Sequence, residues 1–268
     1  MALQTQATGP AAAAPGSRLL TGGGPVVRLT GRSVTVLGHP SPRGLLGELA
    51  AAADRAVVRV GAAWGPGWSQ HVLVVVPTSA GELRDLVGDT RDLSRVAALA
   101  TGSTAAATPG ARDLIVINMP AFGRLSPLGR DVVLTHEVMH LASRAVTGPA
   151  APTWLVEGLA DYAGYLGTTL APRAIASELG ADIGEGVVPA DLPAAADFDA
   201  ANPRLAQSYE QAWFAVRLLA SRYGRAAMLR LYRSVCTGQR LDDALSALGS
   251  SRAVFVRDWR ASMLAALR

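Results

Sequence analysis

The pattern of apolar and polar residues divides the chain into a first part with short strands and a second part with helices. The predicted strands are, in chain order, Val26–Leu29, Ser33–Leu37, His71–Val76, Val96–Thr101 and Asp113–Asn118. The first two flank a short turn that contains glycine, and they therefore predict a β-hairpin. Between the hairpin and the third strand, the apolar residues of Pro42–Trp64 recur with a helical period and predict one long helix.

After residue 125 the apolar period is helical in nearly every segment. The predicted helices are Ser126–Val146, Thr153–Leu166, Leu205–Tyr223, Arg225–Val235, Leu241–Ala247 and Arg252–Leu267. The stretch Gly180–Asn202, rich in Ala, Pro, Gly and Asp, is predicted as an irregular loop. Strands followed by helices predict an α+β fold. We expect a flexible leader over residues 1–17 and a single domain over 18–268, with a sheet-containing lobe (18–125) and a helical lobe (126–268).

Composition narrows the class of protein. Hydrophobic residues make up 50% of the 268 and charged residues 17%, which is typical of a globular protein. We expect neither a transmembrane helix nor a signal peptide, because no apolar run is long enough and residues 1–17 lack a basic start. Cys236 is the only cysteine, which excludes an internal disulfide. The net charge of +4 comes from scattered arginines, so we expect no nucleic-acid partner. Composition leaves the oligomeric state open.

Three ionisable side chains, His136, Glu137 and His140, lie in the apolar middle of the helix predicted from Ser126. His136 and His140 are four residues apart and therefore return to one face of the helix, where both imidazoles can bind one cation. Glu137 lies beside them, within reach of a proton on metal-bound water. The spacing predicts a zinc site with a general base. The alternative is a pair of core histidines with satisfied hydrogen bonds.

A third zinc ligand is predicted on the next helix. Glu157 can face the two histidines if the two helices pack side by side, as their short connection predicts. Asp161, one turn later, is expected to orient a ligand imidazole, which would also relieve its repulsion with Glu157. Gly158 is expected to allow close approach of the metal-bearing helix. The alternative for Glu157 and Asp161 is a solvated helix face.

Taken together, the motif His136-Glu137-x-x-His140 and the downstream Trp154-Leu155-x-Glu157-Gly158-x-Ala160-Asp161-Tyr162 resemble the gluzincin metallopeptidases, specifically the peptidase MA-like group. The resemblance implies a zincin-like fold, in which a small mixed sheet lies over the active-site helix and a mostly helical half follows. It also implies that an edge strand binds extended substrate, and Val96–Thr101 is the candidate. The family's order implies an oxyanion donor on a later helix, for which Tyr209 is the candidate. The alternative is that the ring of Tyr209 only packs beneath the preceding loop.

We therefore predict a zinc metallopeptidase that acts on a peptide or protein substrate, with Zn²⁺ held by His136, His140 and Glu157. Glu137 would take a proton from water and return it to the leaving amine. The resemblance favours a bacterial protein of the cell envelope or exterior. The alternative is a catalytically silent zincin-like domain that uses zinc structurally and binds a partner in its cleft. The presence of Glu137 favours catalysis, because a structural zinc site needs ligands but no base.

Overall fold

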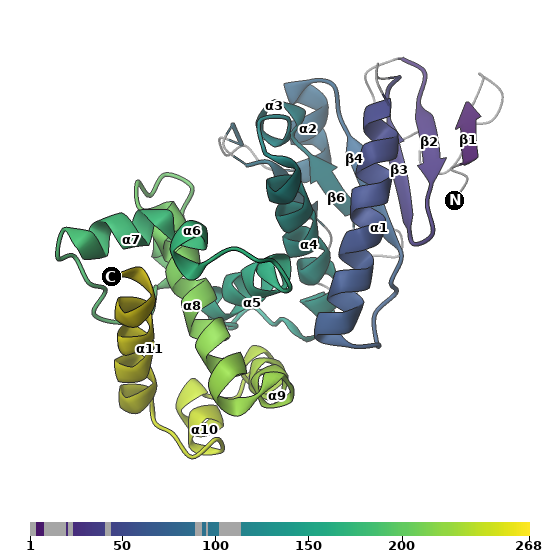
Figure 1. Ribbon diagram of the computed structural model, residues 1–268. Helices are drawn as coiled ribbons and strands as arrows, with labels where there is room; N and C mark the ends of the chain where they lie inside the picture. The colour runs from purple at the N-terminus through teal and green to yellow at the C-terminus, as the bar shows by residue number, and fades with distance from the viewer. Residues whose placement is uncertain are drawn as a thin grey trace. The chain divides into compact units, whose positions relative to one another are not determined.

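A computed structural model describes residues 4–7, 20, 24–40, 44–88, 93–94, 96–101 and 114–268 of the chain. These residues fall into two compact units, Met1–Ser143 and Arg144–Arg268. All described strands lie in the first unit, whereas the second is helical (Figure 1). The predicted α+β class is therefore confirmed. No helix among the described residues is long and apolar enough to cross a membrane.

Six strands of the first unit form one mixed sheet in the order β1-β2-β3-β4-β6-β5. Their bounds are β1 (Gln4–Ala7), β2 (Val27–Thr30), β3 (Val34–Gly38), β4 (Val72–Val76), β5 (Ala98–Thr101) and β6 (Leu114–Ile117). The strands β2 and β3 form the predicted hairpin, and β3, β4 and β6 run parallel to one another. The strand β5 is antiparallel to β6 and ends the sheet on its side, which agrees with the edge strand expected at residues 96–101.

The segment expected to be a flexible leader contains one of these strands. Gln4–Ala7 pairs antiparallel with β2 as strand β1, so the prediction is wrong for these four residues. The rest of residues 1–17 lies outside the described part of the chain. The residues Gln-Thr-Gln-Ala at 4–7 show no alternation of apolar and polar residues, so the sequence predicts no strand there. The strand forms by pairing with β2, which the local sequence does not reveal.

Helices cover both faces of the sheet in the first unit. The helix α1 (Leu45–Trp64) covers one face, where a Cβ placed on Gly38 of β3 would lie 2.9 Å from the Leu46 side chain. The helix α2 (Ala80–Val87) covers the opposite face, where its apolar residues pack against a core that includes Leu37, the neighbour of Gly38. Successive residues of a strand face opposite sides, so the sheet is enclosed between two helical layers.

The short helix α3 (Met119–Phe122) leads into α4 (Pro127–Ser143), the helix that carries the His-Glu-x-x-His motif. Ser126, the first residue of the predicted helix, caps α4, because its Oγ accepts the N–H of Gly129 at 3.1 Å. The boundary between the units falls after Ser143, whereas we expected the sheet-containing lobe to end at residue 125. The helix α4 lies with the sheet because it packs against α1 and β6 (Figure 1) and against β5. Arg55 of α1 also donates to Asp131 of α4 at 2.7 Å.

The second unit consists of helices arranged around one long helix. They are η3 (Arg144–Val146), α5 (Thr153–Tyr165), α6 (Pro172–Ile175), α7 (Ser177–Gly184), η4 (Ala195–Phe198), α8 (Leu205–Tyr223), α9 (Arg225–Cys236), α10 (Leu241–Ser246) and α11 (Arg252–Leu267). The central helix is α8, which packs against α5, α7, α9 and α11. The loop predicted at Gly180–Asn202 is wrong at its start, because α7 continues through Gly184.

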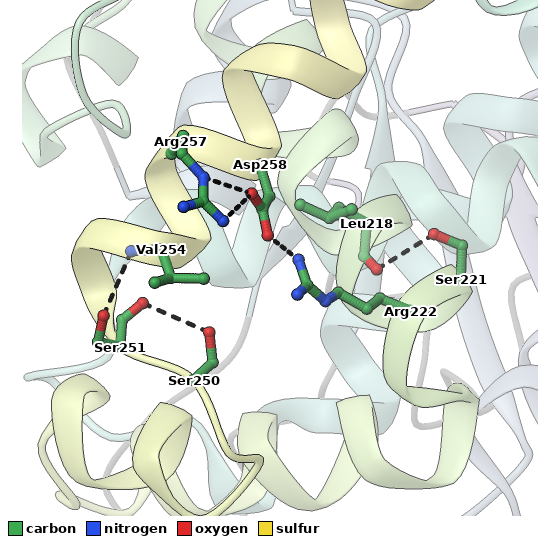
Figure 2. A network of polar contacts seen from close by, with 8 residues as sticks. All are labelled: Leu218, Ser221, Arg222, Ser250, Ser251, Val254, Arg257 and Asp258. Atoms are coloured by element: carbon green, nitrogen blue, oxygen red, sulfur yellow. Dashed lines mark hydrogen bonds and ion pairs between the residues drawn. The ribbon is translucent and has the colours of Figure 1, made fainter.

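An ion-pair network fixes α11 against α8. Figure 2 shows that Arg222 of α8 donates to Asp258 of α11, to which Arg257 also donates at 2.9 Å. Ser251 caps the start of α11, since its Oγ accepts the N–H of Val254. These contacts support the register in which α11 packs on the central helix.

Candidate metal centre

The two histidines of α4 lie with their ring nitrogens together. The Nε2 atoms of His136 and His140 are 2.9 Å apart, and the ring centroids are 4.6 Å apart with an interplanar angle of 77°. Both side chains are half-buried. Two imidazole nitrogens on one tetrahedral zinc ion are about 3.3 Å apart, given zinc–nitrogen bonds of about 2.05 Å. The pair therefore needs to separate by only a few tenths of an ångström to hold a zinc ion.

Glu157 of α5 is the third side chain of a group that could hold a metal ion. One atom from each of His136, His140 and Glu157 can be chosen such that all three lie within 4.8 Å of one another. Within the described part of the chain, this is the one group of at least three His, Cys, Asp or Glu side chains close enough to share an ion. Two imidazoles and a carboxylate are a donor set that zinc takes in sites with an open position. The residues present therefore fit zinc.

Glu137 is buried, with 7% of its surface exposed, although it carries a carboxylate. Its Oε2 accepts a hydrogen bond of 2.6 Å from the backbone N–H of Ala100 in β5. A buried carboxylate is costly unless it is hydrogen-bonded, so this contact offsets part of the cost. The edge strand therefore contacts the residue that the sequence predicts to be the general base.

The predictions for Asp161 and Gly158 of α5 differ in how they compare with the structure. Asp161 is half-buried one turn after Glu157, and its predicted role in orienting an imidazole stays a prediction. A Cβ on Gly158 would lie 2.4 Å from the carbonyl oxygen of Ala212 in α8. The expectation that Gly158 accommodates the metal-bearing helix is therefore wrong, because its open side faces α8. The sequence shows that a helix approaches closely at a glycine, but it does not show which helix.

Tyr209 lies in the second turn of α8, with its ring against η4. The ring meets that of Phe198 edge to face, with centroids 5.3 Å apart and an interplanar angle of 86°. This contact is the packing that the alternative predicts. A role of the hydroxyl at the oxyanion stays a prediction.

The sequence analysis missed a pair of carboxyl groups in the second unit. Glu210 of α8 is buried, and its Oε2 accepts the N–H of Leu179 in α7 at 2.6 Å. Burial and a hydrogen bond with Glu178 raise the pKa of Glu210 to about 8, and the same hydrogen bond lowers the pKa of Glu178. The pair therefore shares one proton near neutral pH. A signal was present, because Glu210 lies three and four residues before Trp213 and Phe214, and a helical period therefore places it on the same face as these apolar residues.

Two other groups of the second unit are held in their protonated forms. Burial, followed by the negative charges of Asp161, Glu210 and Glu178, raises the pKa of Tyr165 to about 12. Burial raises the pKa of Cys236 to about 11, so its thiol is a poor nucleophile at neutral pH. Neither side chain therefore supplies an anionic nucleophile.

No protein-family model and no curated protein matches the chain. Among solved structures, the M1 zinc metallopeptidase from Deinococcus radiodurans is similar at 18% identity and a TM-score of 0.48, over 96% of this chain and 51% of that one. A variant of that enzyme is similar at 19% identity and a TM-score of 0.49, over 96% and 52%. A two-domain M1 zinc metallopeptidase variant bound to L-arginine is similar at 16% identity and a TM-score of 0.44, over 99% and 52%. The chain spans about half the length of these proteins.

Proposed function

We propose that the protein is a zinc-dependent peptidase of gluzincin type in which His136, His140 and Glu157 hold the ion. The proposal depends on the convergence of these three side chains, with ligand atoms within 4.8 Å of one another. The buried carboxylate of Glu137, next to a ligand histidine, favours catalysis over a silent zinc-binding domain, since a structural site needs no base. A location in the cell envelope or outside the cell remains part of the proposal.

A bound zinc ion would supply Lewis acidity and lower the pKa of a bound water molecule. Glu137 would accept the proton of that water and return it to the leaving amine. The edge strand β5 would bind the substrate backbone in an extended conformation. In the same scheme, Asp161 would orient a ligand imidazole and Tyr209 would donate a hydrogen bond to the oxyanion.

The metal content of the purified protein tests the ligand set. After zinc loading and dialysis, the wild type should hold about one equivalent of zinc per chain, as three ligands with one open position predict. The double variant His136→Ala, His140→Ala should hold none. His71→Ala is the matched control, because His71 is an exposed histidine directly before β4, and this variant should bind zinc like the wild type. A zinc-free wild type, or equal zinc in the double variant, would contradict the proposed site.

Cleavage of a fluorogenic peptide library with and without a chelator tests the activity. The zinc-loaded wild type should cleave some member of the library, and the chelator should stop it. Glu137→Gln should retain zinc and lose turnover by about 10²- to 10⁴-fold, because the amide cannot accept the proton. Glu48→Gln, an exposed glutamate of α1, is the control and should cleave normally. A zinc-loaded wild type that cleaves nothing would favour the silent domain.

A further inference from the structure

Among the residues that the structure describes, β5 is the last strand on its side of the sheet, so part of its backbone faces away from β6. The hydrogen-bond register between β5 and β6 shows which residues of β5 face away. Asn118 N–H donates to the carbonyl of Ala97 at 2.9 Å, in line with the register that pairs Ala98 with Ile117. Bonded and non-bonded pairs alternate along an antiparallel ladder, so Leu99 and Thr101 direct their N–H and C=O groups to β6. Ala98 and Ala100 direct theirs to the free edge.

Glu137 accepts a hydrogen bond from one of these outward-facing backbone groups. The outward N–H of Ala100 donates to the Oε2 of Glu137 at 2.6 Å. Both residues belong to the first unit, in which α4 packs against β5. Because the N–H of Ala100 already donates to Glu137, it is not available to pair with an added strand at this edge.

We propose that the backbone N–H of Ala100 is a positioning group for Glu137 and that it sets the register of an extended peptide on β5. The peptide pairs with Ala98, which offers both N–H and C=O at the edge, and with the carbonyl of Ala100 alone. The two residues are about 7 Å apart along the strand, so the peptide bond beside Glu137 lies about one dipeptide from the anchor at Ala98. The register rests on the proposed peptidase function, whereas the contact between Ala100 and Glu137 does not.

Amide hydrogen exchange, followed by NMR on the metal-free protein, tests the contact without an activity assay. Ala100 N–H should exchange slowly in the wild type and about 10-fold faster or more in Glu137→Ala, because a hydrogen bond to a charged group is lost. Leu99, bonded within the ladder, should be unaffected. Glu137→Gln keeps an acceptor oxygen and should retain part of the protection. Unchanged exchange at Ala100 in Glu137→Ala would overturn the proposal, and so would loss of protection along the whole strand in both variants.

Replacement of single backbone amides by esters tests the function of the contact. An ester that removes the N–H of residue 100 should lower kcat about 10-fold or more, with KM and zinc content unchanged. The matched ester at residue 98 should instead raise KM, because it removes part of the peptide anchor. In the Glu137→Gln background the ester at residue 100 should have no further effect on turnover, because the glutamine side chain is no longer a base whose position matters.

The outcomes separate this inference from the proposed function. An unchanged kcat for the ester at residue 100, or a full effect that persists in Glu137→Gln, would overturn the positioning role. If the zinc-loaded wild type cleaves no peptide, the peptidase proposal and the register fail together. The exchange experiment then still decides whether Ala100 holds Glu137.

Discussion

Substitution of Gly158 by alanine tests whether close packing of α5 on α8 stabilises the second unit. The added Cβ would lie 2.4 Å from the carbonyl oxygen of Ala212 and 2.9 Å from Cγ2 of Val216, whereas ordinary contacts begin at 3.4 Å. The two helices would have to separate by about 1 Å to relieve the overlap with the oxygen. That oxygen belongs to the helix backbone and cannot turn aside as a side chain would.

Two opposing effects set the size of the change. Alanine gains about 1 kcal/mol over glycine in the interior of a helix. Overpacking of a buried position costs about 1–3 kcal/mol, and we expect the upper end because a main-chain atom is displaced. The free energy of unfolding should therefore fall by about 2 kcal/mol, which corresponds to a decrease in Tm of about 6–8 °C for a unit of this size.

Thermal unfolding followed by circular dichroism measures this effect, with Gly180→Ala as the matched control. Gly180 lies inside α7 of the same unit, and a Cβ there would meet only the Leu267 side chain, at 3.9 Å. The control should keep or raise Tm because it gains helix propensity without a clash. Displacement of α5 should also weaken zinc binding in Gly158→Ala, since Glu157 is the preceding residue. A Tm for Gly158→Ala at or above that of the wild type would refute the packing argument.

Three further substitutions test the acidic pair and the remaining site residues. Folding raises the pKa of Glu210 from 4.5 to about 8, so the native state holds a proton that the unfolded chain releases between these values. Wild-type stability should fall from pH 5 to pH 9, and Glu210→Gln should flatten this decline, as thermal unfolding across that range will show. Asp161→Asn should weaken zinc binding about 10- to 100-fold in competition with a chelator, with little change in Tm; equal affinity would support a solvated face. Tyr209→Phe should lower turnover about 10²-fold with zinc unchanged, and normal turnover would leave only the packing on Phe198.

The sequence alone determined features that depend on residues close together in the chain. The four-residue spacing of His136 and His140 places both rings on one face of a helix wherever that helix packs. The cap at Ser126 and the β2–β3 hairpin are likewise local, because the bonds that form them span a few residues. The sequence also showed an apolar body around Glu137, and the apolar residues Val132, Leu134, Val138, Met139, Leu141 and Ala142 of this helix are buried.

Only the tertiary structure decided which surfaces meet. Periodicity shows that one face of a helix is buried but not what covers it, so the sequence assigned the contact at Gly158 to the wrong helix. The hydrogen bond from Ala100 to Glu137 joins residues 37 positions apart, and that from Leu179 to Glu210 joins residues 31 apart. Such contacts depend on the pairing of strands and the packing of helices distant in the chain. A protonated Glu210 and a Glu137 carboxylate held by an edge strand therefore arise from the assembled fold.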